Sequence, residues 1–183
     1  TISGTTTVDK EYDRTNTAVL SDGILNGVLP DEDVTLVLSG RYASSNAGGP
    51  YVITSTSTIV GNDIANYTLT QPTLTGNITT APLTITGLTG ANKVYDGNTT
   101  ASFTGTPAYS GLQNLESFAV TGTPTASFAT NIVGNSKPIT VSGYTAPSGN
   151  YSVTQPTLSG NITAKNLTVT GAVAGNKVYD RLN

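Results

Sequence analysis

The sequence predicts an all-β protein made of tandem small β-domains. Apolar and polar residues alternate in short runs, and the same sequence landmarks return after 83 or 84 residues. Gly, Pro and Asn interrupt the chain about every ten residues, as they do where short strands are joined by turns. No long window has the 3.6-residue period of an amphipathic helix, which leaves strands as the predicted elements.

The first landmark is a Lys-x-Tyr-Asp motif that occurs three times. It is found in KEYDRTNTA (10–18), KVYDGNTTA (93–101) and KVYDRLN (177–183). The tyrosines of the first two copies are 83 residues apart, and those of the last two are 84 apart. This regular spacing indicates an internal repeat rather than a chance match.

A second landmark has the same spacing. NYTLTQPTLTGNIT (66–79) returns as NYSVTQPTLSGNIT (150–163), 84 residues later. The chain is therefore predicted to contain a first repeat (1–81), a second repeat (82–165) and the opening stretch of a third (166–183).

Runs with a two-residue period are the strand candidates within each repeat. The clearest lie at 34–38, 67–70, 83–86 and 118–120, where Thr, Val, Ile and Tyr suit a half-buried pleated surface. Segments 21–33 and 109–117 are the best candidates for a short helix or turn. Five or six strands per repeat would fit either a β-sandwich or a β-grasp-like sheet, and the sequence leaves both open.

The joints between repeats are short. Segments 77–87 and 161–171 pass from the last strand of one repeat to the first strand of the next, with about three residues between them. Neither joint is rich in Gly or Ser, so little freedom is expected and the repeats should form an elongated, semi-rigid rod. The opening strand of the third repeat is expected to dock on the second repeat.

The predicted core consists of apolar positions at matching places in the two repeats. These positions are Tyr12, Leu20, Leu36, Tyr67, Leu69, Leu74, Ile78 and Ile85, and then Tyr95, Phe103, Val120, Tyr151, Val153, Leu158, Ile162 and Val169.

The Lys-x-Tyr-Asp motif has a structural and a functional interpretation. In the structural one, Tyr anchors the core while Asp fixes a turn through its side chain. In the functional one, the Tyr–Asp pair binds a ligand, or the lysine is cross-linked. The residues concerned are Lys10, Tyr12, Asp13, Lys93, Tyr95, Asp96, Lys177, Tyr179 and Asp180.

The cross-link would be an isopeptide bond between an early lysine and a late asparagine, as in some exported β-domains. The candidate partners are Asn66 and Asn77 for Lys10, and Asn150 and Asn161 for Lys93. A lysine whose stem covers apolar surface is the simpler alternative.

An acidic turn at Asp31, Glu32 and Asp33 is a candidate calcium site, because calcium binds convergent carboxylates. The second repeat has Leu115, Glu116 and Ser117 at the same places, which favours a solvated turn. No other cofactor is expected.

Composition argues against several classes of function. The formal net charge is −3, with no basic surface for nucleic acid, and no apolar run is long enough to span a membrane. His and Cys are both absent, which removes the commonest general base and the thiol nucleophile. The chain is therefore not expected to be an enzyme.

Together these motifs resemble the YDG-type repeat domain, a relative of MBG domains, found in filamentous-haemagglutinin-like adhesins and other large bacterial surface proteins. Lys93, Tyr95, Asp96 and Gly97 fit the name-giving motif, in which Arg14 departs from the usual Gly. The resemblance implies repeats of a secreted or surface-anchored adhesin, in a Gram-negative bacterium, that form a stalk and have neighbouring repeats as partners. It implies no catalysis.

The alternative is a binding module, in which the repeats recognise a host glycan or protein. A row of exposed tyrosines beside polar groups would favour it. The candidates are Tyr42, Tyr51, Tyr109 and Tyr144.

Overall fold

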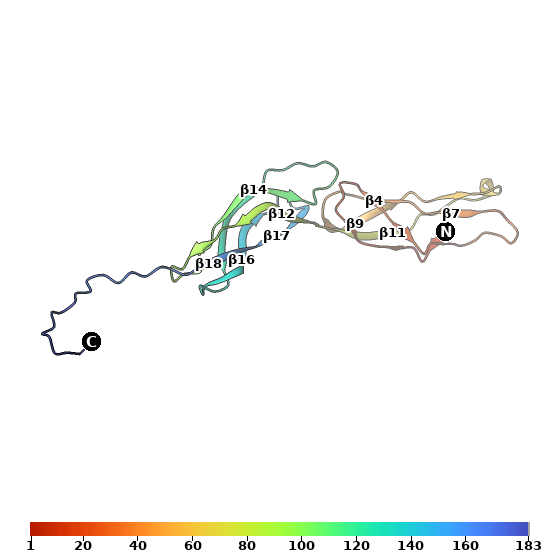
Figure 1. Cartoon of the computed structure of the whole chain (residues 1–183). Coiled ribbons are helices and arrows are strands. Elements are labelled where there is room, and N and C mark those ends of the chain that lie inside the picture. Colours follow the sequence, from red (N-terminus) through yellow and green to blue (C-terminus); the bar gives the residue numbers. More distant parts are fainter. Residues whose placement is uncertain (183) are drawn as a thin grey trace.

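The computed structural model describes residues 1–182 and confirms the all-β prediction (Figure 1). In this part of the chain the one helical element is a single 3-10 turn, η1 (Ile64–Asn66). Segments 21–33 and 109–117 contain turns and strand ends rather than a helix. No helix in the described residues is long and apolar enough to cross a membrane.

The first repeat contains a five-stranded sheet in the order β3-β11-β9-β8-β4 and three two-stranded sheets, β1-β6, β2-β5 and β10-β7. Its strands are more numerous and shorter than the five or six predicted. They are β1 (Ile2–Ser3), β2 (Thr6–Thr7), β3 (Lys10–Glu11), β4 (Thr17–Ala18), β5 (Leu20–Ser21), β6 (Ile24–Leu25), β7 (Thr35–Val37), β8 (Gly40–Tyr42), β9 (Gly48–Ser55), β10 (Thr58–Val60) and β11 (Thr73–Thr79).

The second repeat contains two sheets, β14-β12-β17 and β13-β18-β16-β15. Side chains from both sheets share one core, as in a sandwich: Ile85 comes from the first sheet, and Ile139 and Ile162 from the second. In the described chain no helix covers a sheet in the manner of a β-grasp fold. The strands are β12 (Ala81–Gly90), β13 (Lys93–Val94), β14 (Phe103–Ser110), β15 (Thr121–Phe128), β16 (Gly134–Thr145), β17 (Tyr151–Thr154) and β18 (Thr157–Thr163).

The two repeats meet at a very short connection. Thr80 is the single residue between β11 and β12, fewer than the three expected. Each sheet takes strands from one side of Thr80 only. Figure 1 shows the strands of the first repeat toward one end of the molecule and those of the second beyond them.

A hydrophobic cluster nevertheless crosses this connection. Tyr12, Ile53 and Ile78 of the first repeat pack in one buried cluster with Leu83 and Tyr151 of the second. Because removing such side chains from water is the main favourable term in folding, the two repeats stabilise each other through this shared core.

Most of the predicted core positions are buried or partly buried, but two are not. Tyr95 is 42% exposed and Val169 is 91% exposed. Val169 lies in the stretch 164–182, which contains no strand, so the prediction that the opening strand of the third repeat docks on the second is wrong. Tyr95 is exposed because no further repeat covers it, whereas its counterpart Tyr12 is covered by the second repeat and is 4% exposed.

Replacing Leu83 by Ala is expected to lower the free energy of unfolding by about 2–5 kcal/mol, because Leu83 is fully buried in the shared cluster. Leu167 occupies the same place one repeat later but is 90% exposed, so Leu167→Ala should change it by less than about 0.5 kcal/mol. Urea unfolding followed by circular dichroism measures both. Equal effects of the two substitutions would contradict the assignment of this core.

Candidate functional site: the tyrosine turn and the joint between repeats

The Lys-x-Tyr-Asp motif forms the same local structure in all three copies. The lysine Nζ pairs with the aspartate Oδ1 three residues later, at 2.7 Å for Lys10–Asp13, 2.6 Å for Lys93–Asp96 and 3.0 Å for Lys177–Asp180. The same carboxylate oxygen accepts a hydrogen bond from the backbone N–H two residues further on, which makes an Asx turn. The predicted turn role of Asp is therefore present in each copy.

The lysine closes the turn from the other side. Lys93 Nζ donates to the carbonyl oxygens of Asn98 at 3.1 Å and Thr100 at 3.0 Å. Hydrogen bonds from Lys93 and from the Asn98 N–H hold the pKa of the Asp96 carboxyl below its usual value. The carboxylate therefore stays charged at neutral pH and keeps the ion pair.

The first two copies also share a position in the sheet. The motif strand pairs in parallel with the last strand of its own repeat, with Lys10 opposite Ile78 and Lys93 opposite Ile162. The tyrosine N–H then donates to the end of that strand, from Tyr12 to the Thr79 carbonyl and from Tyr95 to that of Thr163. The motif tyrosine is thereby placed at the end of each repeat that faces the next one.

The isopeptide hypothesis stays a prediction. The carboxamide Nδ2 of Asn77 donates to Asp9 at 3.0 Å, and Asn161 Oδ1 accepts from the Ser136 N–H at 2.8 Å. Asn66 ends the 3-10 turn η1, and Asn150 lies at the joint described below. In the described chain the hydrogen bonds of Lys10 and Lys93 go to their own turns rather than to these asparagines.

The intact mass of the purified protein tests the bond directly. Each isopeptide bond releases one ammonia, so a bonded chain would be lighter than its sequence by one ammonia per bond. The contacts of Lys10 and Lys93 with their turns lead us to expect the unmodified mass. A deficit that disappears in Lys93→Arg would establish the cross-link instead.

The acidic turn is arranged around hydrogen bonds. Asp33 Oδ2 accepts from the backbone N–H and the side chain of Asn62, at 3.0 Å and 2.9 Å, and Asp31 is exposed. Glu32 accepts a short hydrogen bond from the hydroxyl of Tyr67. Among residues 1–182 no three His, Cys, Asp or Glu side chains form a group that could hold a metal ion.

The second repeat reproduces the Tyr–Glu contact. Glu116 accepts a hydrogen bond from the Tyr151 hydroxyl, which itself accepts one from the Gln113 N–H at 3.0 Å. In the first repeat the Tyr67 hydroxyl accepts from the Leu29 N–H, also at 3.0 Å. The middle residue of the acidic turn is thus a glutamate with the same role in both repeats. Its 84-residue spacing was the signal that sequence reasoning missed.

Glu116 also joins the two repeats. Its Oε1 accepts from the Tyr12 hydroxyl at 3.2 Å and lies 3.5 Å from Arg14 Nε. The rings of Tyr12 and Tyr151 meet edge to face, with centroids 5.3 Å apart. Burial and the adjacent Glu116 raise the pKa of both tyrosines, so their hydroxyls remain protonated donors at neutral pH.

Asn150 adds backbone contacts to this joint. Its Oδ1 accepts from the Ala47 N–H at 2.9 Å, and its carbonyl oxygen accepts from the Ala81 N–H at 3.0 Å. Arg14 Nη1 donates to the Asn114 carbonyl at 2.9 Å. The joint therefore combines apolar contact with directional hydrogen bonds, which together fix the orientation of the two repeats.

The predicted row of exposed tyrosines is not on the surface. Tyr42 and Tyr144 are buried, and Tyr51 and Tyr109 are partly buried against the core clusters. The prediction of their exposure is wrong, because alternation places these side chains on the inner faces of their strands.

Removing Glu116 should destabilise the protein, because it leaves two buried tyrosine hydroxyls without their acceptor. Glu116→Ala is expected to cost about 1–3 kcal/mol of unfolding free energy. A double-mutant cycle with Tyr12→Phe should give a coupling of at least about 0.5 kcal/mol. The exposed Glu11→Ala serves as the control, and additivity of Glu116→Ala and Tyr12→Phe would contradict the contact across the joint.

Comparison with known families supports the same division of the chain. A model of the YDG domain matches it twice, over residues 1–75 and 79–158. Neither the curated proteins nor the solved structures gave a match. Each matched range includes one Lys-x-Tyr-Asp turn and one Tyr–Glu contact. The chain belongs to the YDG domain family.

Proposed function

We propose that this chain is a stalk segment of a large secreted or surface-anchored bacterial adhesin of the filamentous-haemagglutinin-like kind, and that it holds a distal binding region away from the cell. The joint between the repeats is the observation that carries the proposal. A stalk needs repeated units whose relative orientation is maintained, and this joint supplies a one-residue connection with a shared core.

The contacts at the joint resist both bending and twisting. The apolar cluster around Tyr12, Leu83 and Tyr151 opposes separation of the repeats, because separation would expose these side chains to water. The hydrogen bonds of Glu116 and Asn150 are directional, so they oppose rotation about the long axis. A Gly- or Ser-rich linker would supply neither constraint.

The chemistry of the surface agrees with a structural role. Charged residues make up only 10% of the chain, so Thr, Ser and Asn provide most of the polar surface. The carboxylates and lysines with defined partners serve turns and the joint. The proposed role involves no catalysis, and the MBG relationship and export to a Gram-negative surface rest on the resemblance of the motifs.

Binding of a host glycan or protein by the repeats themselves remains the alternative. The tyrosines that would have favoured it are buried or partly buried. A glycan array probed with this two-repeat protein tests the alternative, and specific binding would move the function from the stalk to the repeats.

Small-angle X-ray scattering tests the stalk proposal. The wild-type chain is expected to scatter as one elongated particle in which the two repeats keep a fixed orientation. The double variant Tyr12→Ala/Glu116→Ala removes the contact at the joint and should scatter as a broad set of bent shapes. Tyr179→Ala, in the strand-free stretch, is the matched control. A compact or freely jointed wild-type particle would contradict the proposal.

A further inference from the structure

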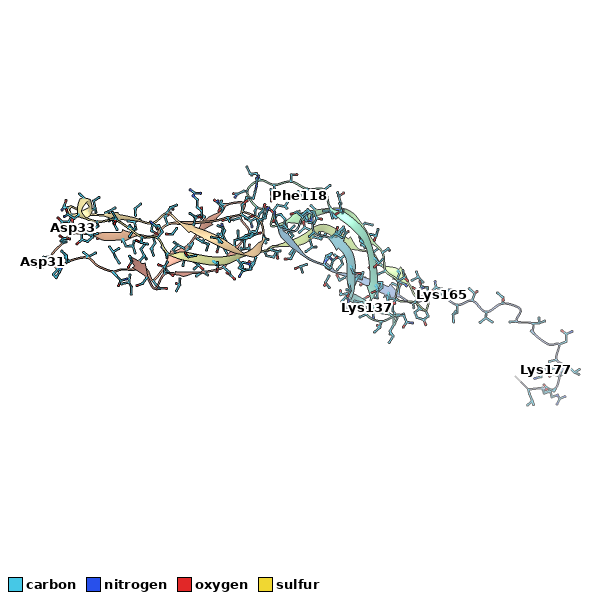
Figure 2. All side chains as sticks on the ribbon, turned by 180° about the vertical axis from the view of Figure 1, so that it is seen from behind. Asp31, Asp33, Phe118, Lys137, Lys165 and Lys177 are labelled. Atoms are coloured by element: carbon cyan, nitrogen blue, oxygen red, sulfur yellow. The ribbon has the colours of Figure 1, made fainter. Side chains whose placement is uncertain are left out.

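The two ends of the strand-bearing body carry the two halves of the joint. At the joint, the turn tyrosine of the first repeat, Tyr12, meets the Tyr151–Glu116 pair of the second. The second repeat has its own turn tyrosine, Tyr95, and the first repeat its own pair, Tyr67–Glu32. In Figure 2 the labels of Asp31 and Asp33, which flank Glu32, lie at the opposite end of this body from Lys165.

The Tyr67–Glu32 end is already assembled for docking. The Tyr67 hydroxyl donates to Glu32 and accepts from the Leu29 N–H, as Tyr151 does with Glu116 and Gln113. Glu116 has a second contact, to the Tyr12 hydroxyl of the neighbouring repeat. Glu32 is therefore placed to accept a second tyrosine hydroxyl in the same way.

The Tyr95 end presents the complementary surface. A cavity of about 520 Å³ is lined by Tyr95, Asn131, Ile132, Val133, Ala164, Lys165 and Leu167. Gly48 and Gly134 each pair with the isoleucine near the end of the last strand, so Val133 corresponds to Ala47. Ala47 is the residue whose N–H binds Asn150 across the joint. The exposed apolar side chains of Ile132 and Val133 thus lie where the joint contacts another repeat.

The stretch after β18 has the sequence of the strand that completes a joint. Residues 164–168 align with 80–84, so that Lys165 takes the place of Ala81 and Leu167 that of Leu83. In the second repeat, β12 pairs in parallel with β17, with Ala81 opposite Tyr151 and Leu83 opposite Val153. The matching segment of the first repeat, 67–70, forms no strand and has no strand partner in the described chain.

We propose that the Tyr95 end of one copy of this chain docks on the Tyr67–Glu32 end of a second copy and adds its 165–167 stretch as an edge strand. By the register of β12 and β17, Lys165 lies opposite Tyr67 and Leu167 opposite Leu69 of the second copy. The Tyr95 ring meets that of Tyr67, and its hydroxyl donates to Glu32. This association goes beyond the stalk role, since it joins separate chains.

The association is weaker than the joint within the chain. Gly97 stands where Arg14 contacts Glu116 and Asn114, and Pro30 stands where Asn114 donates to Asp13. Thr168 aligns with Thr1, so the added strand ends at Leu167. The contact uses different surfaces on the two copies and does not close on itself, so it builds open, head-to-tail chains.

Sedimentation equilibrium from micromolar to millimolar concentration tests the proposal. The wild-type protein should show a weight-average mass that rises with concentration and passes that of a dimer. Tyr95→Ala and Leu167→Asp should each weaken association by about tenfold or more. The controls Tyr179→Ala and Val173→Asp change exposed residues outside the proposed contact and should behave as wild type.

A mixing experiment tests the two surfaces separately. Tyr95→Ala retains only the docking end with Glu32, and Glu32→Ala retains only the end with Tyr95. Each variant alone should stay monomeric, whereas the mixture should form a species of two chains and no larger one. Circular dichroism of each variant checks that it is folded.

Three results would overturn the proposal: a monomer at millimolar concentration, a mass that saturates at the dimer for the wild type, or association unchanged in both Tyr95→Ala and Leu167→Asp. None of these affects the scattering test of the stalk, which concerns the orientation of repeats within one chain.

Discussion

The architecture depends on the contact of Tyr12 with Tyr151 and Glu116. These three side chains close a hydrophobic cluster to which both repeats contribute, and they lie beside a connection of one residue. Without the cluster, Leu83 and Ala81 at the start of β12 would have no apolar surface to cover them. The Lys–Asp turn that precedes Arg14 presents Tyr12 to this site, so the local ion pair serves the contact between repeats.

Sequence reasoning recovered the parts of this structure that repeat. Alternation predicted the strands around Leu83 and Ile85, and turn chemistry predicted the Asx turn at Asp96 because both depend on residues close in sequence. It did not recover the role of Glu116, since the comparison of the two acidic turns emphasised the aspartates that differ. It also placed Tyr95 in the core, because the burial of Tyr12 is provided by a different repeat and not by the strand that carries it.

The sheet topology was beyond the sequence for a related reason. The parallel pairs of β3 with β11 and of β13 with β18 join residues almost 70 positions apart, and no local pattern specifies which strands meet. The first repeat also has its strands broken into pairs of residues, because bends at Gly4 and at Asp22 interrupt the alternation. Periodicity alone therefore could not separate a sandwich from a β-grasp arrangement.

The parallel pairing has a mechanical consequence. In each repeat a strand near the entry lies parallel to the strand at the exit, as β3 does to β11 and β13 to β18. Tension applied to the two ends of the chain would slide such strands along each other, so their hydrogen bonds bear the load together. Antiparallel neighbours pulled apart at their joined end would instead lose hydrogen bonds one at a time. A chain of these repeats is thus arranged to carry force along its length.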